Sequence, residues 1–399
     1  MQGRGAIVVG GYVNALGIVR ALAARGIPSA VVTTQPWDLA QRSRWCMASR
    51  EAQGLDEHPE RIVAALDPWR TRFAGWALLP TTDDALVALA RHRDALAASF
   101  RPITPPEEVV TRLVDKTQLL GAARAAGIDV PHCWGAATPE SAARPDLCFP
   151  VLVKPVVGYR FFARFGVKLL VARDAAELRD AVARVAASGI PCELFDFVPG
   201  GDDRIWTYST WIAAGGEAAP GVTVRKIRQS PQTFGVARVA RVVDDVPGLR
   251  DATLAVARAI GLRGAVTSEF KRDPRDGRFR FLEINGRSVI YNALLRRAGL
   301  DVAELAWLEH VERRPVRARS NGWRGTWINL HADVLHALLR RDDRLDVRAL
   351  VAPYRTPLVE AVWSWNDPAP FAAQWGRTFR QAARSFSASG TAARRPRET

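Results

Sequence analysis

The chain has 399 residues, of which 48% are hydrophobic, so it is long enough for two or three domains with cores of their own. The net charge is +15, but the positive residues spread along the whole chain without a recognised nucleic-acid motif, which argues against a nucleic-acid partner. No apolar run approaches the ~20 residues of a membrane span, no signal peptide is recognisable, and the four cysteines form no CxxC pair, so we expect a cytoplasmic protein in a reducing environment.

Residues 5–34 predict a strand, a glycine-rich turn, a helix and a second strand, which together open a Rossmann-like domain. The turn reads GGYVNALG and the next strand ends in TTQ, so the GxGxxG fingerprint and the later acidic residue of a dinucleotide site are both missing. A nicotinamide-dependent oxidoreductase is therefore kept only as an alternative. Further on, Asp83 and Asp84 follow a strand, where α/β sheets place ligands, although they fit a helix N-cap equally well.

Three prolines between 102 and 106 mark the end of this first domain, and one helix is expected from there to Gly127. After it, FPVLVKPVVG predicts a strand that turns at Pro155, residues 174–187 predict a helix, and CELFDFV predicts a strand. The segments IWTYSTWIAAGG and GVTVRKIRQS predict antiparallel strands. The segments AVTSEFKRD and FRFLEINGRS predict a hairpin around the turn at 274–277.

Lysine is rare in this chain. Of the 56 Lys and Arg residues only five are lysines, and all five lie between 116 and 271. Lysine carries a compact point charge and arginine a planar fork, so the two are not interchangeable at a tight anion site. The positions that kept lysine are therefore candidates for anion contacts: Lys116, Lys154, Lys168, Lys226 and Lys271.

The second strand of the hairpin carries polar side chains that are unusual for a buried strand. Alternation along a strand puts Glu283, Asn285 and Arg287 on one face. Phe281 is expected to share that face, with Leu282 on the other. Carboxylate and amide oxygens are the ligands that Mg²⁺ prefers, so this face is a candidate metal site. The alternative is an edge strand with a solvated polar face.

The order of several motifs resembles the ATP-grasp superfamily, and within it the carboxylate–amine ligase branch with its predicted ATP-grasp and D-aspartate-ligase-like enzymes. The motifs are ALGIVRAL, SRWC, LPTTDD, DKTQLL with AAGIDVP, FPVLVKP, FVPGGDD, SEFKRD and LEINGR, and they run from about residue 5 to at least 310. The resemblance implies α/β and α+β architecture, with a Rossmann-like domain at 1–110 and ATP-grasp subdomains at 111–190 and 191–312. A C-terminal extension follows at 313–399, with a tail that we expect to be disordered from about 386.

The resemblance also implies an activity. It predicts an ATP- and Mg²⁺-dependent ligase, with Mn²⁺ as an alternative metal, that activates a carboxylate as an acyl phosphate and joins it to an amine. ADP and phosphate are the expected products, small-molecule carboxylates and amines the expected partners, and a homodimer is left open. The Arg excess suggests an acidic substrate, but the sequence names neither the carboxylate nor the amine.

The site residues that the resemblance implies fall into three groups. Contacts to the ATP phosphates are expected from Lys116, Lys154, Lys168 and Lys226. Backbone groups of Asp196 and Val198 are expected at the adenine, with Glu193 as a competitor, and Asp202 at the ribose, with Asp203 as its alternative. Metal ligation is expected from Glu269, Glu283 and Asn285.

One catalytic residue is predicted. Arg287 is expected to hold the γ-phosphate or the acyl-phosphate oxygens, where developing charge needs fixed donors. Three further arginines could take that role or bind the substrate carboxylate, and the sequence does not rank them: Arg225, Arg228 and Arg238.

Two segments leave the function open. Many relatives cradle the phosphates with a small Gly/Ser-rich loop, but residues 158–166 read GYRFFARFG. Either Arg160 or Arg164 substitutes for backbone donors, or the loop acts as a lid, or the protein is a catalytically inactive nucleotide-binding protein. The aromatic residues of AVWSWNDPAPF in the C-terminal extension either cover the catalytic domain or form a patch for a partner or a membrane face.

Overall fold

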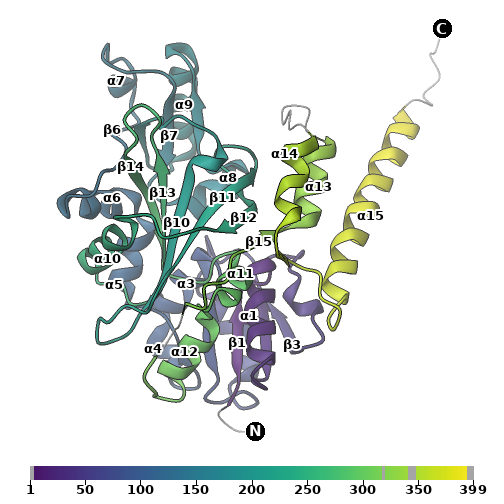
Figure 1. Cartoon of the computed structure of the whole chain (residues 1–399). Helices are drawn as coiled ribbons and strands as arrows, with labels where there is room; N and C mark the ends of the chain where they lie inside the picture. The colour runs from purple at the N-terminus through teal and green to yellow at the C-terminus, as the bar shows by residue number, and fades with distance from the viewer. Residues whose placement is uncertain (1–3, 317–319, 340–346, 393–399) are drawn as a thin grey trace.

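The computed structural model describes residues 4–316, 320–339 and 347–392. Three sheets organise these residues, and the chain passes through them in order before it ends in a helical extension (Figure 1). Among the described residues, no helix is both long enough and apolar enough to cross a membrane.

The N-terminal domain is a parallel sheet in the order β3-β2-β1-β4-β5, and its β1-α1-β2 unit is the βαβ opening that the sequence predicted. The strands β1, β2 and β4 are buried along their whole length because helices cover them, which explains why they read as continuous apolar runs. The elements are β1 (Ala6–Val9), α1 (Val13–Ala23), β2 (Ser29–Thr33), η1 (Ala40–Arg42), β3 (Cys46–Glu51), α2 (Arg61–Leu66), η2 (Asp67–Trp69), β4 (Ala77–Pro80), α3 (Asp83–Arg91), α4 (Arg93–Ala97) and β5 (Arg101–Pro102).

The first subdomain after this domain is an antiparallel sheet in the order β6-β9-β7-β8, backed by helices. The single helix expected up to Gly127 is wrong: it breaks at Asp115, whose carboxylate accepts the backbone N–H of Gln118 at 3.0 Å and caps a new helix that begins at Lys116. The elements are α5 (Glu107–Val114), α6 (Lys116–Ala125), β6 (Cys133–Ala136), α7 (Pro139–Ala142), β7 (Val151–Pro155), α8 (Gly158–Phe165), β8 (Leu170–Ala172), α9 (Ala175–Ser188) and β9 (Cys192–Asp196).

The second subdomain is built on a seven-stranded sheet in the order β14-β13-β10-β11-β12-β15-β16, whose last two strands come from the C-terminal extension. The predicted antiparallel pairs are confirmed, including the hairpin of β13 and β14 at one edge. The elements are η3 (Asp202–Arg204), β10 (Ile205–Ile212), β11 (Val222–Ser230), β12 (Val236–Val242), α10 (Leu249–Ile260), β13 (Gly264–Arg272), β14 (Phe279–Asn285), α11 (Asn292–Arg297) and α12 (Val302–His310).

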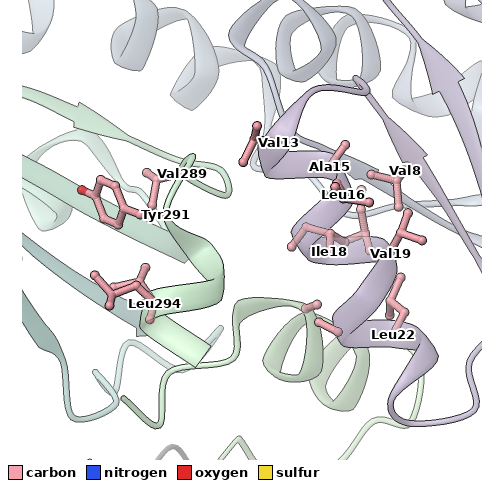
Figure 2. Packing of buried hydrophobic residues seen from close by; sticks show 14 of the residues in the cluster. Val8, Val13, Ala15, Leu16, Ile18, Val19, Leu22, Val289, Tyr291 and Leu294 are labelled. Carbon is pink, nitrogen blue, oxygen red and sulfur yellow. The ribbon is translucent and has the colours of Figure 1, made fainter. Parts of the chain in front are cut away.

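The N-terminal domain and the second subdomain share one hydrophobic core. Leu16 and Val19 of α1 belong to the same buried cluster as Val289, Tyr291 and Leu294, which lie around the start of α11 (Figure 2). This shared cluster joins the two units by direct side-chain packing. The C-terminal end of the parallel sheet is therefore held in a fixed position beside the end of β14.

The C-terminal extension contacts both of the larger units. Asp367 is fully buried and accepts hydrogen bonds from Arg20, Ser43 and the backbone of Arg44 in the N-terminal domain, so the extension also covers that domain and not only the second subdomain. Disorder was expected from about 386, but the structure continues the last helix to Ala392, and residues 393–399 lie outside the described residues. The elements are β15 (Thr326–Ile328), α13 (Leu330–Leu339), α14 (Val347–Val351), η4 (Ala352–Arg355), β16 (Leu358–Glu360) and α15 (Ala369–Ala392).

Candidate active site

A cavity lies between the sheets of the two subdomains. Its walls come from β7 and β9 on one side, from β13 and β14 on the other, and from the loop between β11 and β12. Lys168, which precedes β8, donates to the backbone oxygen of Gly235 in that loop at 3.2 Å and so links the two subdomains across the cavity. The lining combines apolar side chains with several ionised groups, the composition expected of a small-molecule site.

All five lysines of the chain meet here. Four of them line the cavity: Lys116, Lys154, Lys168 and Lys271. The fifth, Lys226, reaches the carboxylate of Glu269 on the cavity wall at 2.5 Å. The structure therefore brings together the four lysines proposed for phosphate contacts and adds Lys271, which the site prediction missed although the rarity of lysine already singled it out.

Two of these lysines are cations in unfavourable surroundings. Lys154 is 8% exposed, and burial, followed by the charge of Lys116, lowers its pKa to about 7. Burial likewise lowers the pKa of Lys271 to about 8. Both ammonium groups lie 5.0 Å from an aromatic ring centroid, Lys154 over Phe195 and Lys271 over Phe197. An anion in the cavity would favour the charged form of both groups.

The two glutamates of the hairpin face each other across the strands. Glu269 on β13 is the direct cross-strand partner of Glu283 on β14, and both line the cavity. Burial by itself would raise the pKa of Glu283, but the surrounding lysines outweigh burial and hold this pKa well below its usual range. Two carboxylates side by side, facing a cavity lined by lysines, form an arrangement that suits a divalent cation bound together with an anionic ligand.

The alternation expected along the second hairpin strand is wrong at one point. The register slips by one residue between Glu269 and Phe270, so β14 contains a bulge at Leu282. As a result Leu282 and Glu283 both line the cavity, while Phe281 and Ile284 are packed in the hydrophobic core behind the sheet. The bulge thus aims Glu283 at the cavity without exposing Phe281.

Asn285, the third predicted metal ligand, ends β14 opposite Thr267 and shares the face of Glu283, but it does not line the cavity. Among the described residues, no three His, Cys, Asp or Glu side chains gather closely enough to hold a metal by themselves. The oxygen ligands present are two carboxylates and one amide nearby, which fits Mg²⁺ or Mn²⁺ completed by phosphate oxygens and water rather than an all-protein metal cage.

The predicted hinge strand borders the cavity. Strand β9 ends at Asp196, and the residues at 196–198 line the cavity. The carboxylate of Asp196 accepts from the indole Nε1 of Trp134 at 2.7 Å, which turns that side chain away from ligand binding. No hydrogen bond in the described part of the chain engages the backbone of Phe197 or Val198, so those groups are available to a ligand. Glu193 does not line the cavity.

The assignment of Asp202 to the ribose is not supported by its position. Asp202 is 7% exposed and its two oxygens accept from the backbone and side-chain nitrogens of Gln229, at 2.7 and 3.0 Å, and from the backbone of Thr233 at 2.7 Å. Thr233 has φ 72°, a conformation that β-branched residues rarely adopt, and it lines the cavity. Asp202 therefore holds the cavity wall in place, and its alternative, Asp203, is bound to Arg225 at 2.9 Å.

The predicted catalytic arginine is already paired. Two nitrogens of Arg287 donate to the carboxylate of Asp83 at 2.6 and 2.9 Å, and a third donates to the backbone of Ser288. Asp83 begins helix α3 at the C-terminal end of the parallel sheet, so the pair joins the N-terminal domain to the end of β14. Asp83 is thus neither a plain helix cap nor a free ligand group. Arg287 would have to release some of its hydrogen bonds to Asp83 before it could contact a phosphate.

The three unranked arginines have structural partners. Arg225 binds Asp203, whereas Arg228 and Arg238 both pair with Asp333 of α13. A register shift on β11 between Lys226 and Arg228 gives the two neighbours different partners, so that Lys226 binds Glu269 while Arg228 binds the extension. The expectation that one of these arginines holds the substrate is therefore not supported for the described structure.

The segment expected as a phosphate loop is a helix. Residues Gly158–Phe165 form α8, with Phe161 fully buried and Phe162 55% exposed, and Gly166 closes the helix at φ 68°. A helix in this place offers few free backbone N–H groups along its length, so it does not form a Gly/Ser-type cradle. Arg160 and Arg164 are both exposed on it.

Comparisons with known proteins identify the fold. Residues 243–307 match the family described as carbamoyl-phosphate synthase L chain, ATP binding domain, while a search of curated proteins found no match. Among solved structures, biotin carboxylase of Campylobacter jejuni covers 81% of this chain and 75% of its own, with 17% identity and a TM-score of 0.64. L-amino acid ligase of Bacillus licheniformis covers 78% and 75%, with 15% identity and a TM-score of 0.61.

A third structure, N5-carboxyaminoimidazole synthetase of Staphylococcus aureus complexed with ADP, covers 84% of this chain and 85% of its own, with 13% identity and a TM-score of 0.63. The chain is thus built as two subdomains that close on a cationic cavity behind a Rossmann-like domain. This is the ATP-grasp fold, which confirms the fold class that the sequence predicted.

Proposed function

We propose that the protein is an ATP- and Mg²⁺-dependent ligase that joins a carboxylate to an amine. The observation that carries this proposal is the convergence of all five lysines and two opposed glutamates on one cavity between the subdomains. That set of charges suits a triphosphate with a divalent cation, because the lysines match phosphate oxygens and the glutamates match the metal. The missing dinucleotide fingerprint and the position of the cavity away from the βαβ turn give no support to a nicotinamide enzyme.

The proposed reaction has two steps. In the first, a carboxylate oxygen forms a bond to the γ-phosphorus while the bond from that phosphorus to the β–γ bridging oxygen breaks, and ADP leaves. In the second, the lone pair of the neutral amine forms a bond to the carbonyl carbon, the bond to the phosphate oxygen breaks, and the nitrogen gives its proton to solvent. The products are an amide, ADP and phosphate.

The residues take the following proposed parts. Glu269 and Glu283 would hold the metal, whose charge neutralises the transferring phosphoryl group. The lysines around the cavity orient and neutralise the phosphates, and the free backbone at 197–198 receives the base. The pairing of Lys226 with Glu269 would have to loosen when a metal binds, since both compete for the same carboxylate.

The direct test measures binding and turnover on one preparation. We expect ATP with Mg²⁺ to raise the melting temperature of the protein and NAD or NADP to leave it unchanged, because only a ligand of the native state stabilises it. ADP and phosphate should then form in equal amounts only when a carboxylate and an amine are both supplied. A melting temperature that responds to NADP and not to ATP would contradict the proposal.

Nucleotide binding is also expected to take up a proton above neutral pH. The pKa of Lys154 is about 7 in the free protein, so near pH 8 much of this amine is neutral, and bound phosphates favour its charged form. Nucleotide affinity should therefore fall as the pH rises from about 7 to 9. Calorimetric titration near pH 8 in two buffers of different ionisation enthalpy would show the uptake as a difference in binding heat.

The matched control for this prediction is Lys154→Arg, which keeps the positive charge at every pH in this range. It should lose the proton uptake contributed by position 154 while it still binds nucleotide. The variant Lys154→Met should bind about ten- to a hundredfold more weakly, because it removes a charge-assisted contact. Equal heats in both buffers for the unmodified protein would contradict the prediction.

A further inference from the structure

A second cavity, of about 240 Å³, lies between the N-terminal domain and the second subdomain. Its lining is mostly apolar and includes Trp211 of β10, Ala265 of β13, and Ala303 and Ala306 of α12. In another protein an apolar cavity of about 150 Å³ holds benzene, so this one has room for an aromatic ring with a short side chain. The cavity that holds the five-lysine cluster is a different one.

The second cavity continues the sheet face that carries the metal-binding glutamates. Side chains on one face recur every second residue, so Ala265 shares the face of Glu269, about 14 Å further along β13. On the neighbouring strand, the face of Glu283 leads past its end to Arg287, which lines this cavity. Asp83 accepts from two nitrogens of Arg287 at 2.6 and 2.9 Å, which fixes the guanidinium at the wall of this cavity beyond the end of β14.

The charged groups of the second cavity favour an anion. Arg93 and Arg263 are both exposed, and neither makes an ion pair within the part of the chain that the structure describes. The carboxylate of Glu309 is engaged by the indole Nε1 of Trp211 at 2.7 Å and the backbone of Ala214 at 2.6 Å. Burial lowers the pKa of His310, so its imidazole is neutral at neutral pH. Arg93 and Arg263 each donate to a backbone oxygen, of Thr104 and Leu262, which leaves their positive charge uncompensated. A ligand ammonium would therefore meet two cations without a carboxylate partner, and no free carboxylate.

From this geometry we infer that the second cavity receives the apolar body of the carboxylate substrate, which is a small acid without an α-ammonium group, such as an aryl-alkanoic acid. This inference rests on the proposed function. The carboxylate end would lie towards Arg287 and the metal-binding face, and the ring would fill the space beside Trp211 and Ala306. Arg93 and Arg263 would attract the anion and disfavour a cationic amine at the same place.

The test measures binding of three probes of similar size to the purified full chain by calorimetry: 3-phenylpropanoate, phenylalanine and phenethylamine. We expect 3-phenylpropanoate to bind at least tenfold more tightly than the other two. Tighter binding of phenethylamine or of phenylalanine would overturn the inference, because either result would mean that the cavity accepts an ammonium group.

Two variants locate the probe. Ala306→Phe fills the cavity and should remove 3-phenylpropanoate binding, while Arg263→Glu reverses an exposed charge at its wall and should weaken binding about tenfold. The control for Arg263→Glu is Arg258→Glu, which makes the same charge reversal at an exposed position on α10. Arg258 lines neither cavity. Binding that is unchanged in Arg263→Glu, or weakened equally in Arg258→Glu, would overturn the assignment even if Ala306→Phe does not fold.

Each sample is also tested for stabilisation by ATP with Mg²⁺, which separates the two proposals. If MgATP raises the melting temperature and 3-phenylpropanoate does not bind, the inference about the second cavity fails and the proposed function stands. If MgATP has no effect, the proposed function fails, and the inference, which rests on it, fails with it whatever the acid does.

Discussion

The variant Glu283→Gln is expected to lower the rate of ADP formation by about a thousandfold or more and to remove its dependence on Mg²⁺. Glutamine keeps the size of the side chain but removes the negative charge that faces the lysines and would hold the metal. Without that carboxylate the metal would no longer be held beside the phosphates, so the negative charge of the transferring phosphoryl group would not be neutralised. The measurement is the initial rate of ADP release over a range of Mg²⁺ concentrations.

The control for this variant is Glu108→Gln, the same chemical change at an exposed position on α5. It should leave the rate and the metal dependence as they are. A Glu283→Gln protein that is folded, as judged by its circular dichroism, and that keeps more than a tenth of the rate would contradict the metal assignment.

Glu283 also links the site to acid stability. Its pKa in the folded chain lies well below the value of about 4.3 expected in the unfolded chain, so it stabilises the fold above that value and loses this effect as the pH falls further. Compared with the variant, the unmodified protein should therefore lose more stability between about pH 4 and the lower pKa of the folded state.

Much of the fold could be predicted from the sequence because its signals are local. Strands β1, β2 and β4 are buried on both faces and read as apolar runs, and the hairpin around 274–277 joins two strands of alternating pattern. The lysine cluster was predictable for a different reason. The chain uses arginine almost everywhere else, so the five lysines marked positions that the structure brings to one cavity.

What could not be predicted depends on neighbours that are distant in sequence. The bulge at Leu282 is a property of the pairing between β13 and β14, so the sequence of β14 alone does not predict it. The partners of Asp202 and Arg287, which are Gln229 and Asp83, come from other elements, so the sequence did not indicate that these two charges are already paired. The spacing of a charged residue within its own segment does not indicate whether a residue far away in the sequence already binds its side chain.

The variant Asp333→Ala is expected to destabilise the protein by about 3–5 kcal/mol, the largest stability effect that we predict. Asp333 is 1% exposed and accepts from Arg228 at 2.8 and 2.6 Å and from the hydroxyl of Tyr354 at 2.8 Å, with Arg238 at 3.3 Å. Its removal would leave the guanidinium of Arg228, which is 4% exposed, without its carboxylate. The measurement is the change in unfolding midpoint in urea and on heating.

The loss of stability in Asp333→Ala should come from a buried arginine charge left without a carboxylate rather than from lost packing contacts. Two comparisons can separate these causes. Asp244→Ala breaks an Asp–Arg pair in which two nitrogens of Arg324 bind one carboxylate oxygen, but Asp244 is 93% exposed, so we expect a loss of about 1 kcal/mol or less. Replacing Asp333 by Leu together with Arg228 and Arg238 by Met should recover most of the loss, since an apolar set of similar volume avoids burying charge. If this triple variant is as unstable as Asp333→Ala, the extension is instead held to the sheet by the specific geometry of the ionic cluster.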